Sequence, residues 1–409
     1  MQRFACRACG ATGLELVLSL GRMPLANALL TREQLGSPER RYPLDLAFCP
    51  SCTLVQITET VPAADLFSEY LYFSSYSETM LRHAQALVQR LIEERGLGPA
   101  SLVIEVASND GYLLQYYQQA GIPVLGIEPA ANIARVAVAE RGIPTLCEFF
   151  TRRTGERLRA EGQTADVVHA HNVLAHVSDL NDFVSGLHAV LRQSGVVVVE
   201  APYLRDLIER CEFDTIYHEH LCYFSLTALV KLFRRHGLQV QDVERVAIHG
   251  GSLRVTVARL ESAIATPAVE VMLAEEAAWG VGSVATYREF ATRVEALKAS
   301  LIHVLGSIKS RGERIAAYGA AAKGSTLLNY AGIGLETLDF VVDRNPYKQG
   351  RYMPGVHLPI SAPERLLEEM PEHVLLLTWN FADEILQQQA AYRKLGGRFI
   401  IPVPEVRAA

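Results

Sequence analysis

Between residues 101 and 202 the sequence alternates short apolar runs with stretches of helical periodicity, and this alternation constrains the fold more than any other feature. Four runs have the length and composition of buried strands: LVIEVA, VLGIEP, ADVVHAHN and GVVVVEAP. Strands that alternate with helices along a chain form parallel sheets. The sequence therefore predicts an α/β fold, with a doubly wound sheet in the middle of the chain.

A second alternation begins at residue 313, with RIAAYGAAAKGSTLLNY followed by LDFVVD, HVLLLTW and RFIIPVP. It predicts a C-terminal Rossmann-like α/β domain over residues 313–409. The strand LRVTV at residues 253–257 is expected to close the central sheet at its edge. Residues 266–312 are charged and Ala-rich, which indicates a helical linker. A length of 409 residues agrees with two or three domains, since single cores rarely exceed about 250–300 residues.

Four cysteines near the N-terminus form two Cys-x2-Cys pairs, Cys6 with Cys9 and Cys49 with Cys52. This spacing lets two tight turns present four sulfurs to one tetrahedral zinc ion. Four thiolates leave no open coordination position, so the zinc is expected to be structural rather than catalytic. We predict a zinc-binding domain over residues 1–65, with disulfides as the weaker alternative in a reducing compartment.

The composition excludes several classes of protein. Hydrophobic residues make up 49% and charged residues 21%, which is typical of globular proteins and excludes wholesale disorder. A net charge of −6 without a long basic run argues against nucleic-acid binding. The chain has neither a signal-peptide pattern nor a run of 18 apolar residues, so we expect a cytoplasmic protein that does not bind membranes. The oligomeric state stays open, and a monomer is compatible with the sequence.

The turn after the first strand of the central domain is a candidate cofactor site, because doubly wound sheets bind ligands at the carboxyl ends of their strands. This turn retains only Gly111 of a dinucleotide-binding glycine pattern. Glu105 and Asp110 would repel a pyrophosphate but suit a ligand that carries sulfonium and ammonium groups. Glu128 ends the next strand, where it can accept both hydroxyls of a ribose or lie on the surface as an ordinary acid. The turn favours S-adenosylmethionine over NAD.

The cluster Tyr217-His218-Glu219-His220 follows the strand VVVVEAP and is expected at the same edge of the sheet. Methyl transfer to carbon needs a carbon nucleophile, and a sugar carbon becomes one as an enolate beside a ketone. Histidine is suited to remove that proton near neutral pH, so we predict His220 as the base. Tyr217 and Glu219 are expected to hold the substrate or balance the enolate charge, or Glu219 orients His220. The alternative is a set of hydrogen-bonded polar residues at a helix start.

The EVASNDGYLL turn, the two cysteine pairs and the Tyr217-His218-Glu219-His220 cluster followed by LCYFS together resemble the nucleotide-sugar C-methyltransferase family. The resemblance covers essentially the whole chain. It implies a central class I methyltransferase Rossmann-like domain over residues 66–265, S-adenosylmethionine as cofactor, and a nucleotide-linked 4-keto-6-deoxysugar, such as a dTDP-sugar, as substrate. The methylated carbon would lie next to the ketone at C-4, and we favour C-3 over C-5, which also flanks it.

The same resemblance implies roles for individual residues. It places the methionine part of the cofactor beside Ala107, Asn109, Asp110 and Gly111, the ribose at Glu128, and the adenine near Glu148 and Phe149. It places His176 at the active site, with His171 as a second candidate, and Tyr72 in preference to Tyr70. Packing is the alternative for both histidines and both tyrosines.

The C-terminal domain repeats a strand-turn-helix arrangement in AYGAAAKGST at residues 317–326, whose small residues can admit a phosphate. The resemblance places the sugar nucleotide between the central and C-terminal domains. We select Lys323, Arg344, Asn345 and Tyr347 as substrate-binding residues, with helix-cap and surface roles open for each.

Two other functions are compatible with parts of the sequence. An NAD-dependent sugar-nucleotide oxidoreductase would use the turn at residues 318–323, which lacks a full GxGxxG pattern. A non-catalytic zinc adaptor would explain the cysteines, but it would leave the histidine cluster and both turns without a use.

Overall fold

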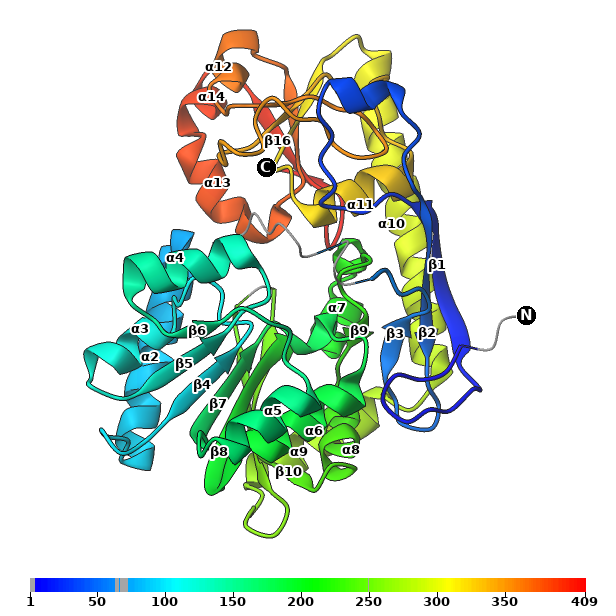
Figure 1. Ribbon diagram of the computed structural model, residues 1–409. Helices are drawn as coiled ribbons and strands as arrows, with labels where there is room; N and C mark the ends of the chain where they lie inside the picture. The colour runs from blue at the N-terminus through cyan, green and yellow to red at the C-terminus, as the bar shows by residue number, and fades with distance from the viewer. Residues whose placement is uncertain (1–3, 63–65, 67–72, 249) are drawn as a thin grey trace.

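The computed structural model describes residues 4–62, 66, 73–248 and 250–409. Its described residues form three sheets (Figure 1), of four, seven and six strands. The seven-stranded sheet and the six-stranded sheet lie one above the other in this view, and the N-terminal strands run along one side, next to the long helix α10. None of the described helices is long and apolar enough to cross a membrane.

The central sheet has the strand order β10-β11-β8-β7-β4-β5-β6. Its strands are β4 (Val103–Val106), β5 (Val124–Ile127), β6 (Thr145–Leu146), β7 (Ala165–His171), β8 (Leu191–Pro202), β10 (Leu238–Val246) and β11 (Ser252–Arg259). The strands from β6 to β8 in this order are parallel, whereas β11 and β10 are antiparallel to their neighbours. The expectation that residues 253–257 close the sheet is wrong, because residues 238–246 add a further strand outside them.

Helices cover both faces of this sheet, which explains why every residue of β4 is buried. The helices of this part of the chain are α2 (Glu78–Arg95), α3 (Leu114–Gln119), α4 (Ala131–Arg141), α5 (Arg152–Ala160), α6 (Leu180–Val190), α7 (Leu204–Glu209) and α8 (Leu226–Arg234), with the short 3-10 turns η2 (Ser74–Tyr76), η3 (Leu174–His176) and η4 (Phe213–Thr215). The sequence sets the ends of α2: the Ser77 side chain accepts the amide of Met80, and Gly96 ends the helix with a positive φ.

The N-terminal module contains β1 (Glu15–Met23), η1 (Glu33–Gly36), β2 (Tyr42–Phe48) and β3 (Val55–Ile57). Its antiparallel sheet has the order β1-β2-β3-β9, and β9 (Cys222–Tyr223) comes from the central part of the chain. Because β9 begins two residues after His220, the sheet of the N-terminal module is joined directly to the segment that contains the predicted base. The sequence pattern does not predict this pairing.

Helices α9 (Pro267–Trp279) and α10 (Val284–Ser310) occupy the segment expected to be a helical linker. Helix α10 packs against the N-terminal module rather than standing alone (Figure 1): Tyr287 stacks on Phe48 with ring centroids 4.7 Å apart, and Arg288 pairs with Glu15.

The C-terminal sheet has the order β14-β13-β12-β15-β16-β17, in which β17 is the antiparallel strand. Its elements are β12 (Ile315–Tyr318), α11 (Ala322–Ala331), β13 (Val341–Val342), β14 (Ile360–Ser361), α12 (Arg365–Glu369), β15 (His373–Leu376), η5 (Trp379–Phe381), α13 (Ala382–Gln388), α14 (Ala390–Lys394), β16 (Arg398–Ile401) and β17 (Arg407–Ala408).

Candidate active site

The four N-terminal cysteines lie together. Their sulfurs are all within 4.8 Å of one another, with 3.4 Å between Cys6 and Cys52 and 3.6 Å between Cys9 and Cys49. A tetrahedral zinc with Zn–S bonds of about 2.3 Å needs sulfurs at about this spacing. The amides of Gly10 and Thr53 close the two knuckles by donating to the carbonyls of Cys6 and Cys49. These cysteines therefore fit one structural zinc ion.

The predicted cofactor turn follows β4 and has an unusual backbone. Ala107, Asn109 and Gly111 all have positive φ, of 53°, 49° and 76°. A Cβ on Gly111 would lie 2.9 Å from Cγ1 of Ile143, so a glycine is needed there. Strained non-glycine residues of this kind gather at ligand-binding loops. The side chain of Asn109 also accepts the amide of Ser74, which ties the chain ahead of α2 to this turn.

Two acidic residues, Glu105 in β4 and Asp110 in the turn, are buried. Oε2 of Glu105 and Oδ1 of Asp110 have no hydrogen-bond partner within the residues that the structure describes. Burial raises the pKa of Glu105 well above its ordinary value. The other oxygen of Asp110 lies 3.3 Å from Arg141. Buried acceptors without partners fit a ligand that brings ammonium donors, as S-adenosylmethionine does.

Glu128 is buried at the end of β5. Its carboxylate accepts the amide of Asn109 at 3.0 Å and the amide of Ala130 at 2.8 Å, so it organises the turn from behind. Each carboxylate oxygen has a second lone pair, which leaves capacity for ribose hydroxyls. Glu148 pairs with Arg157, and the ring of Phe149 is 47% exposed. The exposed ring is free of the core and available for stacking.

His220 is half-buried and held through both ring nitrogens. Nδ1 lies 3.0 Å from the carbonyl of Thr215, and Nε2 lies 2.9 Å from the hydroxyl of Tyr217. A carbonyl can only accept, so Nδ1 carries the proton and Nε2 accepts from the phenol. In the neutral ring this arrangement leaves the lone pair on Nε2, as a general base requires. The hydrogen-bond acceptor that orients the His220 ring is therefore the Thr215 carbonyl and not Glu219.

Glu219 is buried next to this ring in the chain. Burial raises the pKa of its carboxyl to about 7, although a hydrogen bond from Asn27 opposes the shift. Asn27 belongs to the N-terminal module, and its Nδ2 lies 2.7 and 2.9 Å from the two carboxylate oxygens. His218 points elsewhere: its Nε2 lies 3.1 Å from the carbonyl of Pro43.

His176 lies beside the predicted base. Its ring centroid is 4.9 Å from that of His220, and its Nδ1 is 2.7 Å from the carbonyl of Glu219. Burial lowers the pKa of His176, which keeps the ring neutral near pH 7. The structure thus brings His176, Tyr217, Glu219 and His220 together. Tyr70 and Tyr72 lie outside the described residues.

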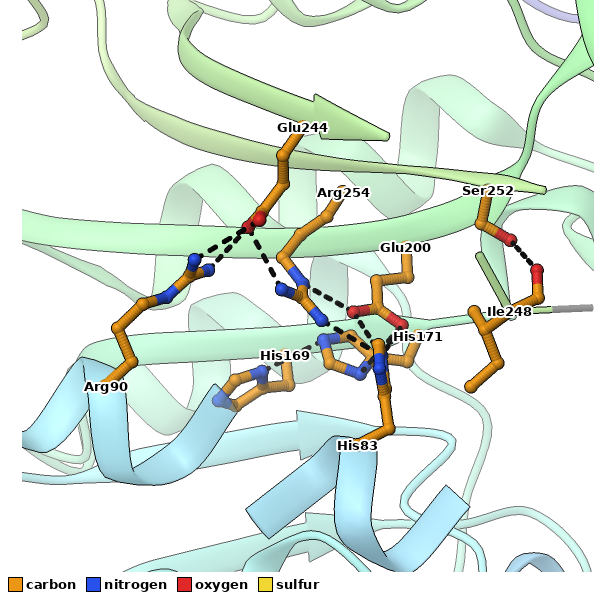
Figure 2. Close-up of polar contacts among 9 residues, drawn as sticks. All are labelled: His83, Arg90, His169, His171, Glu200, Glu244, Ile248, Ser252 and Arg254. Carbon is orange, nitrogen blue, oxygen red and sulfur yellow. Dashed lines mark hydrogen bonds and ion pairs between the residues drawn. The ribbon is translucent and has the colours of Figure 1, made fainter. Parts of the chain in front are cut away.

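Figure 2 shows the surroundings of His171. Its Nε2 lies 3.1 Å from Nδ1 of His169, and its Nδ1 lies 3.9 Å from the carboxylate of Glu200. Glu200 also accepts from Nε of Arg254 at 2.6 Å and contacts Nε2 of His83 at 2.9 Å. Burial lowers the pKa of His171 to about 4. His171 is therefore a neutral member of a buried network that fixes α2 to strands β7, β8 and β11.

The predicted substrate residues of the C-terminal domain do not form one cluster. Nζ of Lys323 is 2.8 Å from Oδ1 of Asn380 and 4.5 Å from the ring centroid of Trp379. Burial lowers the pKa of Lys323, while Asp214 and Glu212 of the central domain raise it. Lys323 thus lies at the contact between two domains. Two other candidates, Arg344 and Tyr347, are exposed by 67% and 57%.

Asn345 has a local role in the same domain. Its backbone amide donates to Asp343, and its side-chain oxygen accepts the amide of Tyr347. The carboxylate of Asp343 also accepts the amide of Ala320, so it organises the turn ahead of α11.

Three family models together match most of the chain. They are a zinc binding domain over residues 6–67, a methyltransferase domain over residues 76–243 and a C-methyltransferase C-terminal domain over residues 247–404. The C-methyltransferase NovU of Streptomyces niveus is 39% identical over 403 residues, which cover 98% of this chain and 96% of NovU. The chain belongs to the C-methyltransferase family.

Two other similar proteins each match less than half of this C-methyltransferase. The ubiquinone biosynthesis O-methyltransferase of Methylobacterium sp. (strain 4-46) is 27% identical over 185 residues, covering 40% of this chain and 71% of that protein. The magnesium protoporphyrin IX methyltransferase of Synechocystis PCC 6803, solved with bound S-adenosylmethionine, is 15% identical with a TM-score of 0.34 over 44% of this chain and 79% of that chain.

The C-methyltransferase has S-adenosylmethionine as its cofactor and a four-cysteine zinc site in its N-terminal domain.

Two residues that contact the site are absent from the sequence-based prediction. Asn27 lies on an exposed turn, and nothing local in the sequence marks it as a partner of Glu219. Trp379 donates through Nε1 to Oδ2 of Asp214 at 2.7 Å, one residue before Thr215. Its only sequence signal is its rarity, since the chain has two tryptophans.

Proposed function

We propose that this C-methyltransferase methylates a nucleotide-linked 4-keto-6-deoxysugar, such as a dTDP-sugar, at a carbon next to the ketone, with C-3 favoured over C-5. The observation that carries the proposal is the pair of contacts of the His220 ring, Nδ1 with the Thr215 carbonyl and Nε2 with the Tyr217 hydroxyl. The Thr215 carbonyl holds the proton on Nδ1, so Nε2 has the lone pair that removes a proton alpha to a ketone. A methyltransferase that acts on oxygen or nitrogen has no need to generate a carbanion first.

The residues around His220 have separate tasks in this proposal. Nε2 takes the alpha proton, and the imidazolium formed then donates to the Thr215 carbonyl and to the Tyr217 oxygen. The Tyr217 hydroxyl, released from its bond to Nε2, can donate to the enolate oxygen. Glu219 accepts a hydroxyl of the sugar and so holds the ring against the base. His176, neutral and 4.9 Å from His220, forms the adjacent wall.

S-adenosylmethionine supplies an electrophilic methyl group when it is bound. The residues proposed to hold it are those of the β4 turn, namely Ala107, Asn109, Asp110 and Gly111, together with Glu128, Glu148 and Phe149. The support is the positive φ of the turn, its buried unpartnered acceptors and the exposed Phe149 ring. Tyr72 stays a proposed active-site residue on the basis of the family resemblance.

The sugar nucleotide is proposed to bind between the central and C-terminal domains, near Lys323, Arg344, Asn345 and Tyr347. Two of these candidates are available to a ligand, because the side chains of Arg344 and Tyr347 are largely exposed. Lys323 would have to leave Asn380 to reach a diphosphate, so we expect a smaller contribution from it.

Product analysis tests the proposal. The enzyme is incubated with S-adenosylmethionine and a panel of nucleotide-linked sugars, half of which have a ketone at C-4 and half a hydroxyl. We expect a mass gain of one methyl group for the keto sugars alone, and NMR of the product assigns C-3 or C-5. Methylation of the 4-hydroxy sugars at oxygen would contradict the proposal, as would transfer to none of the sugars by an enzyme that binds the cofactor.

A further inference from the structure

The carboxylate of Glu219 has its hydrogen-bond donor in a different domain. Nδ2 of Asn27 lies 2.7 Å from Oε1 and 2.9 Å from Oε2, so a single amide spans both oxygens. Glu219 is only 6% exposed, whereas Asn27 lies in an exposed turn after β1. Among the residues that the structure describes, no second donor reaches this carboxylate. The buried acid therefore depends on one residue of the zinc-binding module.

The backbone around these two residues is fixed, so their contact is not that of two loose loops. The amide of Ile57 in the zinc-binding module donates to the carbonyl of Leu221 at 3.0 Å, two residues after Glu219. Three residues after Asn27, Leu30 exchanges two backbone hydrogen bonds of 2.9 Å with Tyr352 of the C-terminal domain. The C-terminal domain thus holds the turn that carries Asn27, and strand β3 of the zinc-binding module holds the segment that follows Glu219.

The environment of Glu219 gives this contact a chemical consequence. Burial without a positive partner raises the pKa of the carboxyl to about 7, and the Asn27 amide is the opposing influence. A hydrogen bond donated to a carboxylate favours the ionised form and restricts its rotation. Without Asn27, the buried side chain would be protonated and free to rotate at neutral pH.

We propose that Asn27 is a positioning residue for methyl transfer, through which the zinc-binding module holds Glu219, the residue before the base in the chain, as an oriented carboxylate. The inference rests on the proposed function, because it assumes that Glu219 binds the substrate. It assigns the zinc-binding module a part in the active site in addition to its own folding.

Two variants test the proposal, Asn27→Ala, which removes the donor, and Asn27→Asp, which places a second carboxylate against Glu219. For Asn27→Ala we expect kcat to fall about tenfold, the value of one hydrogen bond to a charged group, with unchanged cofactor affinity, zinc content and melting temperature. The acidic limb of the pH-rate profile should move to higher pH, because Glu219 then ionises later. Asn27→Asp should move the acidic limb to still higher pH, because a second carboxylate disfavours ionisation of Glu219. Gln34→Ala is the matched control, since Gln34 is exposed in the same module and bonds locally to Thr31.

A double-mutant cycle separates positioning from a general structural effect. In a Glu219→Gln background, Asn27→Ala should cost little, since the group on which Asn27 acts has already been neutralised. An equal loss in both backgrounds would overturn the proposal, and so would an unshifted pH profile.

A measurement without turnover keeps this test separate from the proposed function. The carboxyl carbon of Glu219, labelled with ¹³C-glutamate and assigned with Glu219→Gln, is titrated by NMR in the wild type and in Asn27→Ala. A higher midpoint in the variant supports the contact even if no sugar is methylated. An identical midpoint contradicts it.

Discussion

The hydroxyl of Tyr217 lies 2.9 Å from Nε2 of His220, and the two rings are in contact with centroids 4.1 Å apart. The Tyr217 hydroxyl is thus hydrogen-bonded to the same nitrogen that, in the proposed function, removes the substrate proton. In Tyr217→Phe the ring contact remains and the hydroxyl is lost. We expect kcat to fall about tenfold or more with little change in melting temperature, because a donor to the enolate is gone. Steady-state kinetics with saturating substrate measure this, and a variant with wild-type kcat would remove Tyr217 from the mechanism.

The zinc site can be tested by Cys49→Ser. Four sulfurs within 4.8 Å of one another have the arrangement of a four-cysteine zinc site, so the loss of one ligand should release zinc and lower the melting temperature. Metal analysis of the purified variant should give well under one zinc per chain. Cys147→Ser is the control, because Cys147 is exposed and lies outside the cluster. Full zinc content and unchanged melting of Cys49→Ser would contradict the assignment.

Glu128 supports both the turn and the proposed ribose contact. Glu128→Ala should weaken S-adenosylmethionine binding by about 1–3 kcal/mol, the scale of a hydrogen-bonded charged partner. Glu128→Gln should lose less cofactor affinity than Glu128→Ala, since its side-chain oxygen can still accept one of the two amides at residues 109 and 130. Calorimetric titration compares the two variants with the wild type. Equal affinity in all three would place the ribose elsewhere.

The contact between the central and C-terminal domains predicts a dependence of stability on pH. Burial raises the pKa of Glu212 to about 8, so the folded protein keeps a proton that the unfolded chain releases above about pH 4.5. The contribution of Glu212 to the free energy of unfolding should therefore decrease as the pH rises from about 5 to 8. Glu212→Gln removes this titration and should stabilise the protein at pH 8 by about 1–3 kcal/mol relative to wild type.

Urea unfolding at pH 5.5 and pH 8 measures this difference, with Glu405→Gln as the control because Glu405 is exposed. If the difference in stability between pH 5.5 and pH 8 were the same in Glu212→Gln as in the wild type, the prediction would be contradicted.

The parts of the structure that the sequence predicts are those with a local signal. Each cysteine pair is a short motif whose spacing contains its geometry, and the strands of the central sheet are continuous apolar runs because helices cover both faces. Strand β10 has a weaker local signal, because the apolar residues of LQVQDVERV are spaced by two and then by three positions, with an irregularity between Val240 and Asp242. The sequence-based prediction does not include this strand and therefore places residues 253–257 at the edge.

The parts that the sequence does not predict depend on contacts between distant residues. Strand β9 has two residues, too few for a periodic signal, and its partner β3 lies more than 160 positions earlier. Asn27 and Glu219 are separated by 192 positions. Asparagine is common in exposed turns, so nothing in the sequence around Asn27 indicates a distant partner. His171 illustrates the converse: a histidine at a strand end resembles a catalytic residue until Glu200 and Arg254 are seen around it.

The most direct test of the account is exchange of the substrate proton by His220. The wild-type enzyme is mixed with a nucleotide-linked 4-keto sugar and a cofactor analogue that cannot transfer its methyl group, in deuterated solvent. We predict deuterium at the carbon next to the ketone, and a 10²–10⁴-fold slower exchange and methylation in His220→Asn, the usual contribution of a positioned base. Sugar and cofactor binding should persist, and His303→Asn, on the exposed side of α10, should behave as wild type. Exchange and methylation at nearly the wild-type rate in His220→Asn would contradict the account.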